Sequence, residues 1–291
     1  MRGDIRCYEE PRAVLGEGPL WDPQRGRLTW LDAAEKMMFT LDPASGQIAS
    51  TELPHYPGSY AYRGDGSMIM AYRNALAIID GGTAASDQLE TPGVDFTVER
   101  FNDGACDRAG RFWVGTMDRK LKDPVGALFR LDPDRRLTRM VGELTASNGI
   151  AFSPDDRVMY HTDTGAACIY AYDFDIDTGA IANRRVFADF TNWRGRPDGC
   201  TIDAEGCIWA AAIGAGEVVR IDPAGRRVAE IPLPVVRPTS VMFGGADLRT
   251  LFITSMQFGL SPDELAAQPQ AGCLFAVDVD VPGLPEPCFA G

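Results

Sequence analysis

Residues 107–116 read DRAGRFWVGT, a polar turn followed by a short alternating strand. Five further copies of this element lie along the chain: DPQRGRLTWLD at 22–32, GDGSMIMAY at 64–72, DDRVMYHTD at 155–163, DAEGCIWAA at 203–211 and DLRTLFITS at 247–255. The aspartates that mark the six copies are 43, 42, 48, 48 and 44 residues apart. Self-similarity at a period of about 45 residues is typical of a repeat architecture.

The six repeats predict an all-β fold, a six-bladed β-propeller with four-stranded antiparallel blades. A second strand that ends in aspartate and a turn, such as FTLDPASG at 39–46, follows each copy of the first element. A TIM barrel would need eight helical crossovers, whereas the best helical segment is the short SPDELAAQ at 261–268, with serine at its cap. We expect one domain over residues 1–291, in which residues 4–12 add an outer strand to the last blade and close the ring.

The composition is that of a folded, acidic protein. The 291 residues carry 28 Lys+Arg against 41 Asp+Glu, a net charge of −13, and 45% of them are apolar. This balance argues against nucleic acid or an anionic membrane as a partner, because both bind through Lys/Arg patches. No stretch approaches about 18 apolar residues, and the N-terminus lacks the apolar core of a secretory signal. The seven scattered cysteines form no CxxC pair, so we expect reduced thiols and a cytoplasmic location.

Polar residues recur at one position of the repeat, near the start of the strand that precedes each polar turn. In a propeller this first strand lines the central channel. The six equivalent residues are Glu17, Tyr60, Asn102, Asn148, Asp198 and Ser240. Four of them carry a carboxylate or carboxamide, although Asp and Asn are poor strand formers. Two interpretations stay open: ordinary Asn-Gly and Asp-Gly turns, or oxygen ligands that converge on a divalent cation in the channel.

Longer segments connect these residues to a known family. They are LGEGPLWD at 15–22, RFNDGACDRAGRFWVGTM at 100–117, SNGIAFSPDDRVMYHTD at 147–163, DTGAIANRRVFADF at 177–190, PDGCTIDAEGCIWAA at 197–211 and GLSPDELAAQPQAGCLFAV at 259–277. With this ordered set the sequence resembles the senescence-marker/gluconolactonase/luciferin-regenerating family of six-bladed propellers. The resemblance implies a divalent-metal-dependent hydrolase that acts mostly on sugar lactones, and some relatives cleave organophosphate esters.

The resemblance also implies roles for individual residues. Glu17, Asn148 and Asp198 match the family's metal ligands. Asp198 also matches the proposed general base of the family. Arg100 matches a substrate-binding arginine, and Asn102 matches a residue that faces the ion or the substrate.

One departure from the family concerns the residue after the GTM run. The family often carries there an acidic residue that touches the sugar, and this chain has Asp118-Arg119-Lys120. We assign Asp118 to substrate binding at this position. Because the run Asp118-Arg119-Lys120 departs from the family's pattern, we expect a substrate preference different from that of the gluconolactone-hydrolysing members.

The chemistry of lactone hydrolysis agrees with these assignments. A divalent ion with open positions polarises the carbonyl, lowers the pKa of a bound water and stabilises the charge of the tetrahedral intermediate. Asp198 is assigned as the general base, and Arg100 and Asn102 as partners of the sugar hydroxyls. The oxygen ligands favour Ca²⁺, Mg²⁺, Mn²⁺ or Fe²⁺, and Zn²⁺ also stays open as the single bound ion.

The predicted function is therefore hydrolysis of an aldonolactone of the glucono-, xylono-, arabino- or galactono-lactone type by a monomer or weak homo-oligomer. An organophosphate or ester hydrolase on the same site is one alternative. A non-catalytic calcium-binding propeller scaffold is another, since a fold alone implies no chemistry.

The remaining conspicuous residues receive mainly structural interpretations. A Ser-His-Asp hydrolase is disfavoured because GxSxG is absent and His161 lies inside the strand VMYHTD; we expect His161 to pack in the interior. Asp163 is a weaker candidate for the channel lining. Trp193 precedes the Pro197-Asp198 segment, and its loop is left open as a cover for the site. The tryptophans expected in the blade core are Trp30, Trp113 and Trp209.

Overall fold

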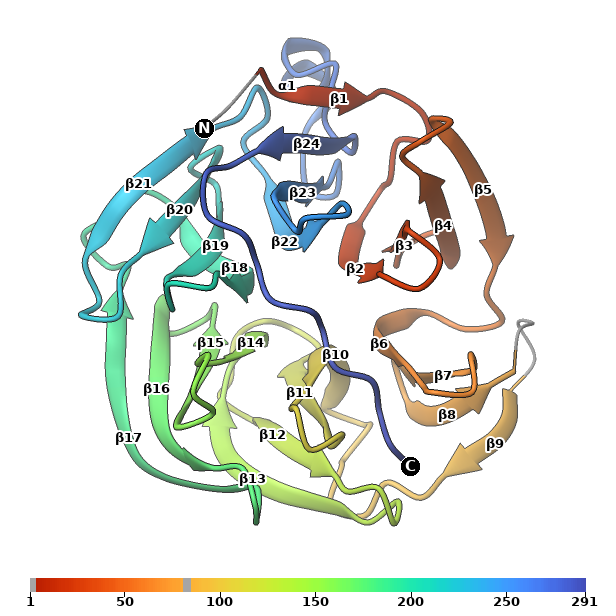
Figure 1. The fold of residues 1–291 in the computed structure, drawn as a ribbon, viewed down its shortest axis with the longest axis vertical. Coiled ribbons are helices and arrows are strands. Elements are labelled where there is room, and N and C mark those ends of the chain that lie inside the picture. The colour runs from red at the N-terminus through yellow and green to blue at the C-terminus, as the bar shows by residue number, and fades with distance from the viewer. Residues whose placement is uncertain (1–3, 81–84) are drawn as a thin grey trace. The chain divides into compact units, whose positions relative to one another are not determined.

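The computed structural model describes residues 4–80 and 85–291, and its regular elements there are β-strands apart from one short helix. The strands form six four-stranded antiparallel sheets (Figure 1). The all-β six-bladed propeller with four-stranded antiparallel blades is therefore confirmed. The chain divides into two compact units, Met1–Glu52 with Asn192–Pro285 and Leu53–Thr191 with Glu286–Gly291, which we describe separately. The single-domain interpretation stays a prediction.

The first unit holds three sheets. Their strands are β2 (Gly16–Asp22), β3 (Arg27–Asp32), β4 (Met37–Asp42) and β5 (Gln47–Glu52); β18 (Arg196–Ile202), β19 (Ile208–Ile213), β20 (Glu217–Ile221) and β21 (Arg227–Pro232); and β22 (Pro238–Gly244), β23 (Thr250–Ser255) and β24 (Leu274–Asp278) with β1 (Arg6–Tyr8). β1 is the outer strand of the last of these sheets and lies antiparallel to β24, with Cys7 opposite Phe275. The first strands of the three sheets are in contact, with β22 next to both β2 and β18.

The second unit also holds three sheets. Their strands are β6 (Pro57–Tyr62), β7 (Met68–Tyr72), β8 (Ala75–Ile79) and β9 (Ala85–Leu89); β10 (Glu99–Cys106), β11 (Phe112–Asp118), β12 (Gly126–Leu131) and β13 (Leu137–Leu144); and β14 (Ser147–Phe152), β15 (Val158–Asp163), β16 (Cys168–Asp175) and β17 (Ala180–Asp189). Here β10 contacts both β6 and β14. In each unit the first strands of neighbouring sheets therefore lie side by side.

The hydrogen bonds of the aspartate in the polar turn explain why this residue recurs in the repeats. Asp107 accepts hydrogen bonds from the backbone N–H groups of Ala109 and Arg111 through Oδ1, which closes the turn. Its Oδ2 accepts from Nε1 of Trp113 at 2.9 Å. Asp203 and Trp209 repeat the contact at 2.9 Å. The turn thus orients the tryptophan of the next strand, and all three tryptophans expected in the core are buried.

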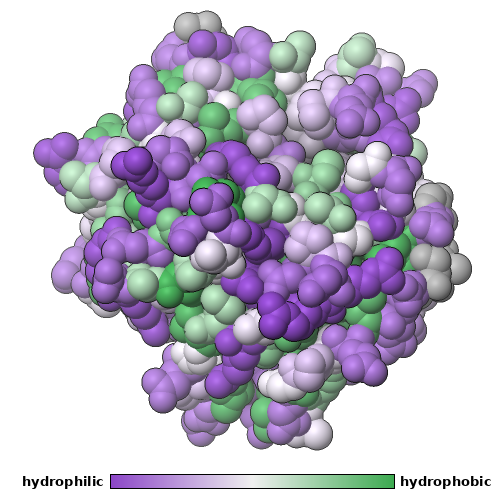
Figure 2. Space-filling view, turned by 60° about the horizontal axis from the view of Figure 1, so that its bottom comes forward, coloured by the Kyte–Doolittle hydropathy of each residue, from purple (hydrophilic) through white to green (hydrophobic). Residues whose placement is uncertain are grey.

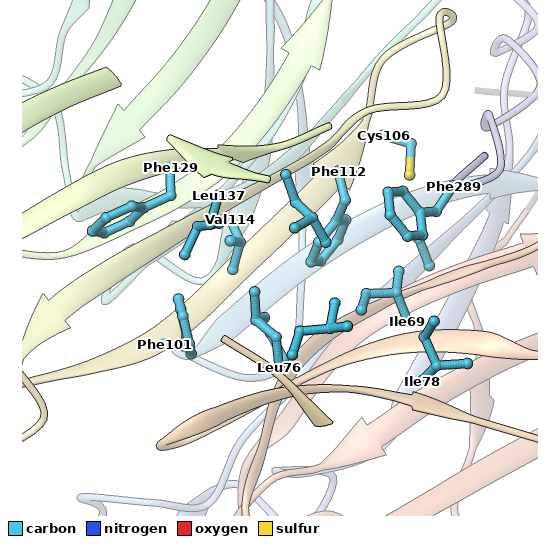
Figure 3. Packing of buried hydrophobic residues seen from close by; sticks show 14 of the residues in the cluster. Ile69, Leu76, Ile78, Phe101, Cys106, Phe112, Val114, Phe129, Leu137 and Phe289 are labelled. Carbon is cyan, nitrogen blue, oxygen red and sulfur yellow. The ribbon is translucent and has the colours of Figure 1, made fainter. Parts of the chain in front are cut away.

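Apolar side chains fill the space between neighbouring sheets. In the second unit, side chains from β7 and β8 face side chains from β10, β11 and β12, as Figure 3 shows for Ile69, Leu76, Phe101, Phe112 and Phe129. Phe289 of the C-terminal segment joins this cluster beside Cys106 and Phe112 and is 1% exposed. Packing of this kind holds the first strands in place beside one another.

Hydrophilic residues cover most of the face in view in Figure 2, with hydrophobic ones between them. The short helix α1 (Pro262–Ala267) is the one expected from the sequence, and Ser261 caps it in a capping box with Glu264. Within the described residues, no helix has the length and apolar character needed to cross a membrane.

Candidate active site

A β-bulge interrupts the first strand of every sheet. The register between first and second strand shifts by one residue at Glu17/Leu20, Pro57/Ser59, Phe101/Gly104, Asn148/Ile150, Pro197/Cys200 and Pro238/Val241. A bulge places an extra residue in one strand and re-aims its side chain. The residues singled out from the sequence, Glu17, Asn102, Asn148 and Asp198, lie at or inside these bulges. Their poor strand propensity is therefore accommodated by local backbone that departs from regular pairing.

In the first unit, Glu17 and Asp198 lie on the strands on either side of β22. Thr239 of β22 donates from Oγ1 to the carbonyl of Gly16, next to Glu17, at 2.5 Å. On the other side, a Cβ added to Gly199 would overlap Ser240, so glycine after Asp198 permits close approach of β22. Asp198 is 6% exposed and Glu17 is half-buried. The two carboxylates thus lie on first strands that are separated by β22, which carries Thr239 and Ser240.

In the second unit, three predicted site residues form one hydrogen-bonded row. Arg100 Nη1 donates to Asn102 Oδ1 at 2.9 Å, and Asn102 Nδ2 donates to Asn148 Oδ1 at 2.7 Å and to the carbonyl of Ser147 at 3.0 Å. Asn148 Nδ2 donates to Thr164 Oγ1 at 2.8 Å. Since a guanidinium only donates, it fixes which end of the Asn102 amide faces it, and this in turn fixes the orientation of Asn148. One lone pair of Asn148 Oδ1 is then left for a further partner.

Asp118 lies at the end of β11, in a different kind of environment. It is 4% exposed, and its carboxylate accepts hydrogen bonds from the backbone N–H groups of Asp123, Lys122 and Lys120. These bonds hold the pKa of Asp118 below its usual value. The carboxylate therefore organises the loop that follows β11. Its assignment to substrate binding stays a prediction.

Asp32 and Asp163 occupy the same strand-end position in their own sheets. Asp163 accepts from the backbone N–H groups of Thr145, Ala146, Gly165 and Ala166. Asp32 accepts from those of Val14, Leu15, Ala34 and Glu35. In both cases the carboxylate links the segment before the first strand to the loop after the second strand. These contacts favour a structural role for Asp163 as an anchor of these two segments over the expected role in the channel lining.

His161 is buried beside the row described above. Its Nε2 lies 2.7 Å from Ser147 Oγ, and both side chains are 0% exposed. Burial lowers the pKa of His161 to about 3, and Arg184 adds to this by repulsion. Among the described residues Nδ1 has no hydrogen-bond partner. The ring is therefore a neutral interior group that contacts Ser147, the residue before Asn148, in agreement with the expected packing role.

Asp103 is a candidate that the sequence reasoning missed. It follows Asn102 inside the bulge of β10, and burial raises the pKa of its carboxyl to about 6, against the hydrogen bond from the Gly104 N–H at 2.8 Å. A carboxyl with such a pKa is suited to proton transfer near neutral pH. The signal in the sequence was the pair Asn102-Asp103 itself, of which only the first residue matched the repeat position.

Within the described residues, no group of three or more His, Cys, Asp or Glu is placed to hold a metal ion. That finding does not bear on the predicted ligand set, because Asn148 contributes a carboxamide. The donors of that set are two carboxylates and one amide oxygen, all at bulges of first strands. Hard divalent cations prefer oxygen donors of this type, so the chemistry of these three side chains suits such an ion.

Known proteins resemble this chain along its length. The family described as SMP-30/Gluconolactonase/LRE-like region matches residues 15–257. This chain belongs to that family. The 6-deoxy-6-sulfogluconolactonase of Pseudomonas putida is 39% identical over 292 residues, which cover 100% of both chains. Regucalcin of Danio rerio is 36% identical over 295 residues, which cover 99% of this chain and 98% of the relative.

A solved structure of a family member agrees with the fold. The crystal structure of a calcium-binding protein, regucalcin, from Agrobacterium tumefaciens has a TM-score of 0.93 at 31% identity and covers 98% of this chain and 97% of its own. The family resemblance predicted from the sequence is thus confirmed. The prediction of an ester-bond hydrolase of the lactonase type is confirmed at the level of the family, whose members include proteins named as lactonases.

Proposed function

We propose that this chain is a divalent-metal-dependent sugar lactonase that hydrolyses an aldonolactone to its aldonic acid. The observation that carries the proposal is the row of Arg100, Asn102 and Asn148, joined by hydrogen bonds of 2.9 and 2.7 Å across two sheets. Such a row presents a cation and amide groups, which suit the hydroxyl and carbonyl oxygens of a sugar lactone. Family membership supports the same conclusion.

Glu17, Asn148 and Asp198 are the proposed metal ligands. All three present oxygen donors at first-strand bulges. A divalent ion held by them would polarise the lactone carbonyl and lower the pKa of water. Ca²⁺ is the ion suggested by a relative named as calcium-binding, and Mg²⁺, Mn²⁺, Fe²⁺ and Zn²⁺ are the other candidates.

The chain's own residues would carry the proton and hold the substrate. Asp198 takes a proton from a water whose oxygen bonds to the carbonyl carbon of the lactone. The acyl C–O bond of the ring then breaks, and the ring oxygen takes that proton back from Asp198 and leaves as a hydroxyl of the aldonic acid. Asp103 is the second candidate for this base, because its pKa is raised to about 6. Arg100 and Asn102 bind hydroxyl groups of the sugar, and Asp118 contacts the substrate from the end of β11.

Two other functions would use the same residues. A phosphoester or other ester could take the place of the lactone, and a calcium-binding scaffold would hold the ion without turnover. The name of a relative as a calcium-binding protein favours testing the second possibility. We propose a cytoplasmic enzyme, since all seven cysteines are free thiols, that works as a monomer or weak homo-oligomer on a small molecule.

The test is lactone hydrolysis followed by pH-stat on chelator-stripped protein, with each divalent ion restored in turn and spontaneous hydrolysis subtracted. A panel of pentono- and hexonolactones is the substrate set. Metal-restored turnover of a lactone well above background is the expected result. Metal binding without turnover of any lactone would reject the proposal, and phosphoesters would then be tested on the same protein.

A further inference from the structure

Two arginines flank one tyrosine at the outer end of the row described above. The Cζ atom of Arg100 lies 5.3 Å from the centre of the Tyr56 ring, and that of Arg73 lies 5.6 Å from it. Arg73 follows β7, and its backbone N–H donates to the carbonyl of Tyr56 at 2.7 Å. The carbonyl of Arg73 in turn accepts from Phe101 N–H, beside Arg100, at 3.1 Å. These backbone hydrogen bonds hold the main chain of Arg73 beside that of Tyr56 and that of Phe101, and both guanidinium groups lie near the Tyr56 ring.

Arg73 lacks hydrogen-bond partners of the kind that Arg119, a third arginine of this region, has. Its Nε is buried and has no hydrogen-bond partner among the described residues. By contrast, Arg119 Nη1 donates to Asn74 Oδ1 at 3.1 Å and to the carbonyl of Phe96 at 2.7 Å. A buried donor without a partner costs stability unless something else satisfies it. In a chain with a net charge of −13, such a cation is unusual.

The nearest carboxylate on the strand of Arg100 does not serve Arg73. Glu99 is 5% exposed and accepts from Asp95 N–H at 2.9 Å and from the hydroxyl of Thr116. Arg73 and Tyr56 are both half-buried, so solvent and solutes reach them. The second unit thus carries a positively charged group, the guanidinium of Arg73, whose Nε is not hydrogen-bonded by the described side chains.

We propose that Arg73 and Arg100 form a subsite for an anionic group, a sulfonate or phosphate, on the end of the lactone remote from its carbonyl. This inference rests on the proposed function and names its substrate class. The row runs from Asn148, a proposed metal ligand, through Asn102 and Arg100 to Tyr56 and Arg73, so the reacting carbonyl and the anion lie at opposite ends of it. Guanidinium groups bind the oxygens of such anions in a forked geometry.

Arg73→Gln tests the subsite on three substrates: glucono-1,5-lactone, its 6-phosphate, and 6-deoxy-6-sulfoglucono-1,5-lactone. We expect KM for at least one anionic lactone to rise about 10- to 100-fold, the value of one charge-assisted bond, and kcat/KM for the neutral lactone to stay within about twofold. The phosphate and sulfonate arms distinguish the two anions. Arg157→Gln, which removes an exposed arginine from the turn after β14, is the matched control and should change none of these values.

An equal effect of Arg73→Gln on neutral and anionic lactones would overturn the inference, as would no effect on either. A second measurement needs no variant: 6-phosphogluconate should inhibit hydrolysis of the neutral lactone by the unmodified enzyme about tenfold more strongly than gluconate, and equal inhibition would contradict the subsite. If no lactone is hydrolysed, the proposed function fails by itself. Calorimetric titration of the two acids into the unmodified protein and Arg73→Gln then tests the subsite independently, with loss of selective 6-phosphogluconate binding as the expected result.

Discussion

The bulges of the first strands and the ends of the second strands both carry Asp or Asn, but the side chains have different partners. Asp32, Asp118 and Asp163, at the strand ends, accept hydrogen bonds from several backbone N–H groups each. At the bulges, Asn102 and Asn148 bind each other across two sheets. A carboxylate whose oxygens accept several hydrogen bonds from its own loop has a structural role. A side chain at a bulge whose oxygen accepts a hydrogen bond from one other side chain still has a lone pair on that oxygen that can accept a bond from, or coordinate, a ligand.

The largest effect that follows from this difference is expected for Asp198→Asn. Loss of the proposed base and of one proposed metal-binding charge should lower kcat for the lactone by about 10²- to 10⁴-fold. Steady-state kinetics with restored metal measures this. Retained turnover with metal bound would move the role of base to Asp103.

Asn102→Ala removes the centre of the hydrogen-bonded row. The guanidinium of Arg100 and the amide of Asn148 would each lose a partner, so we expect kcat/KM to fall about 10- to 100-fold. A thermal melt of the same variant should show that most molecules remain folded. A variant with unchanged kcat/KM would break the link between the bulge position and substrate binding.

Asp118→Asn probes the strand end and should lower stability more than activity. An amide oxygen accepts the backbone N–H groups of Lys122 and Asp123 less strongly than a carboxylate does, so the free energy of unfolding should fall by about 1–2 kcal/mol. Urea denaturation measures that loss, and kcat should change less than about tenfold. If instead activity disappears while stability is unchanged, Asp118 contacts the substrate directly.

A smaller effect is expected from His161, on the pH dependence of the free energy of unfolding. Burial depresses its pKa to about 3, whereas in the unfolded chain it titrates near pH 6.5. Below about pH 6.5 only the unfolded state gains this proton, so the imidazole makes stability fall with decreasing pH, by at most about 1.4 kcal/mol per pH unit. Glu286, whose pKa is raised to about 7 by burial, acts in the opposite direction.

The difference between the unmodified protein and His161→Gln isolates the histidine from Glu286. We expect this difference in the free energy of unfolding to decrease from pH 7 to pH 5. A difference that does not depend on pH would show that His161 is protonated to the same extent in the folded and unfolded states.

The sequence predicts the blades better than it predicts which polar residues belong to the site. The repeated aspartates before Trp113 and Trp209 mark local turns, and local turns can be recognised from a short segment. The link from Asn102 to Asn148 joins residues 46 positions apart, so its geometry depends on how two sheets pack. The hydrogen bonds that Asp118 accepts from Lys122 and Asp123 could not be predicted from the sequence, because they depend on the conformation of the loop after β11. Arg73 belongs to no sequence motif. What distinguishes it is that its buried Nε has no hydrogen-bond partner among the described residues, and only the structure shows this.

The central claim is that first-strand bulges bind the ligand and strand ends hold the loops. Calorimetric titration of Mn²⁺ into chelator-stripped protein, Asn148→Ala and Asp118→Asn tests it most directly. We predict that Asn148→Ala weakens Mn²⁺ binding by at least about tenfold and that Asp118→Asn leaves it unchanged. Unchanged affinity in Asn148→Ala, or a loss in Asp118→Asn instead, would contradict the account.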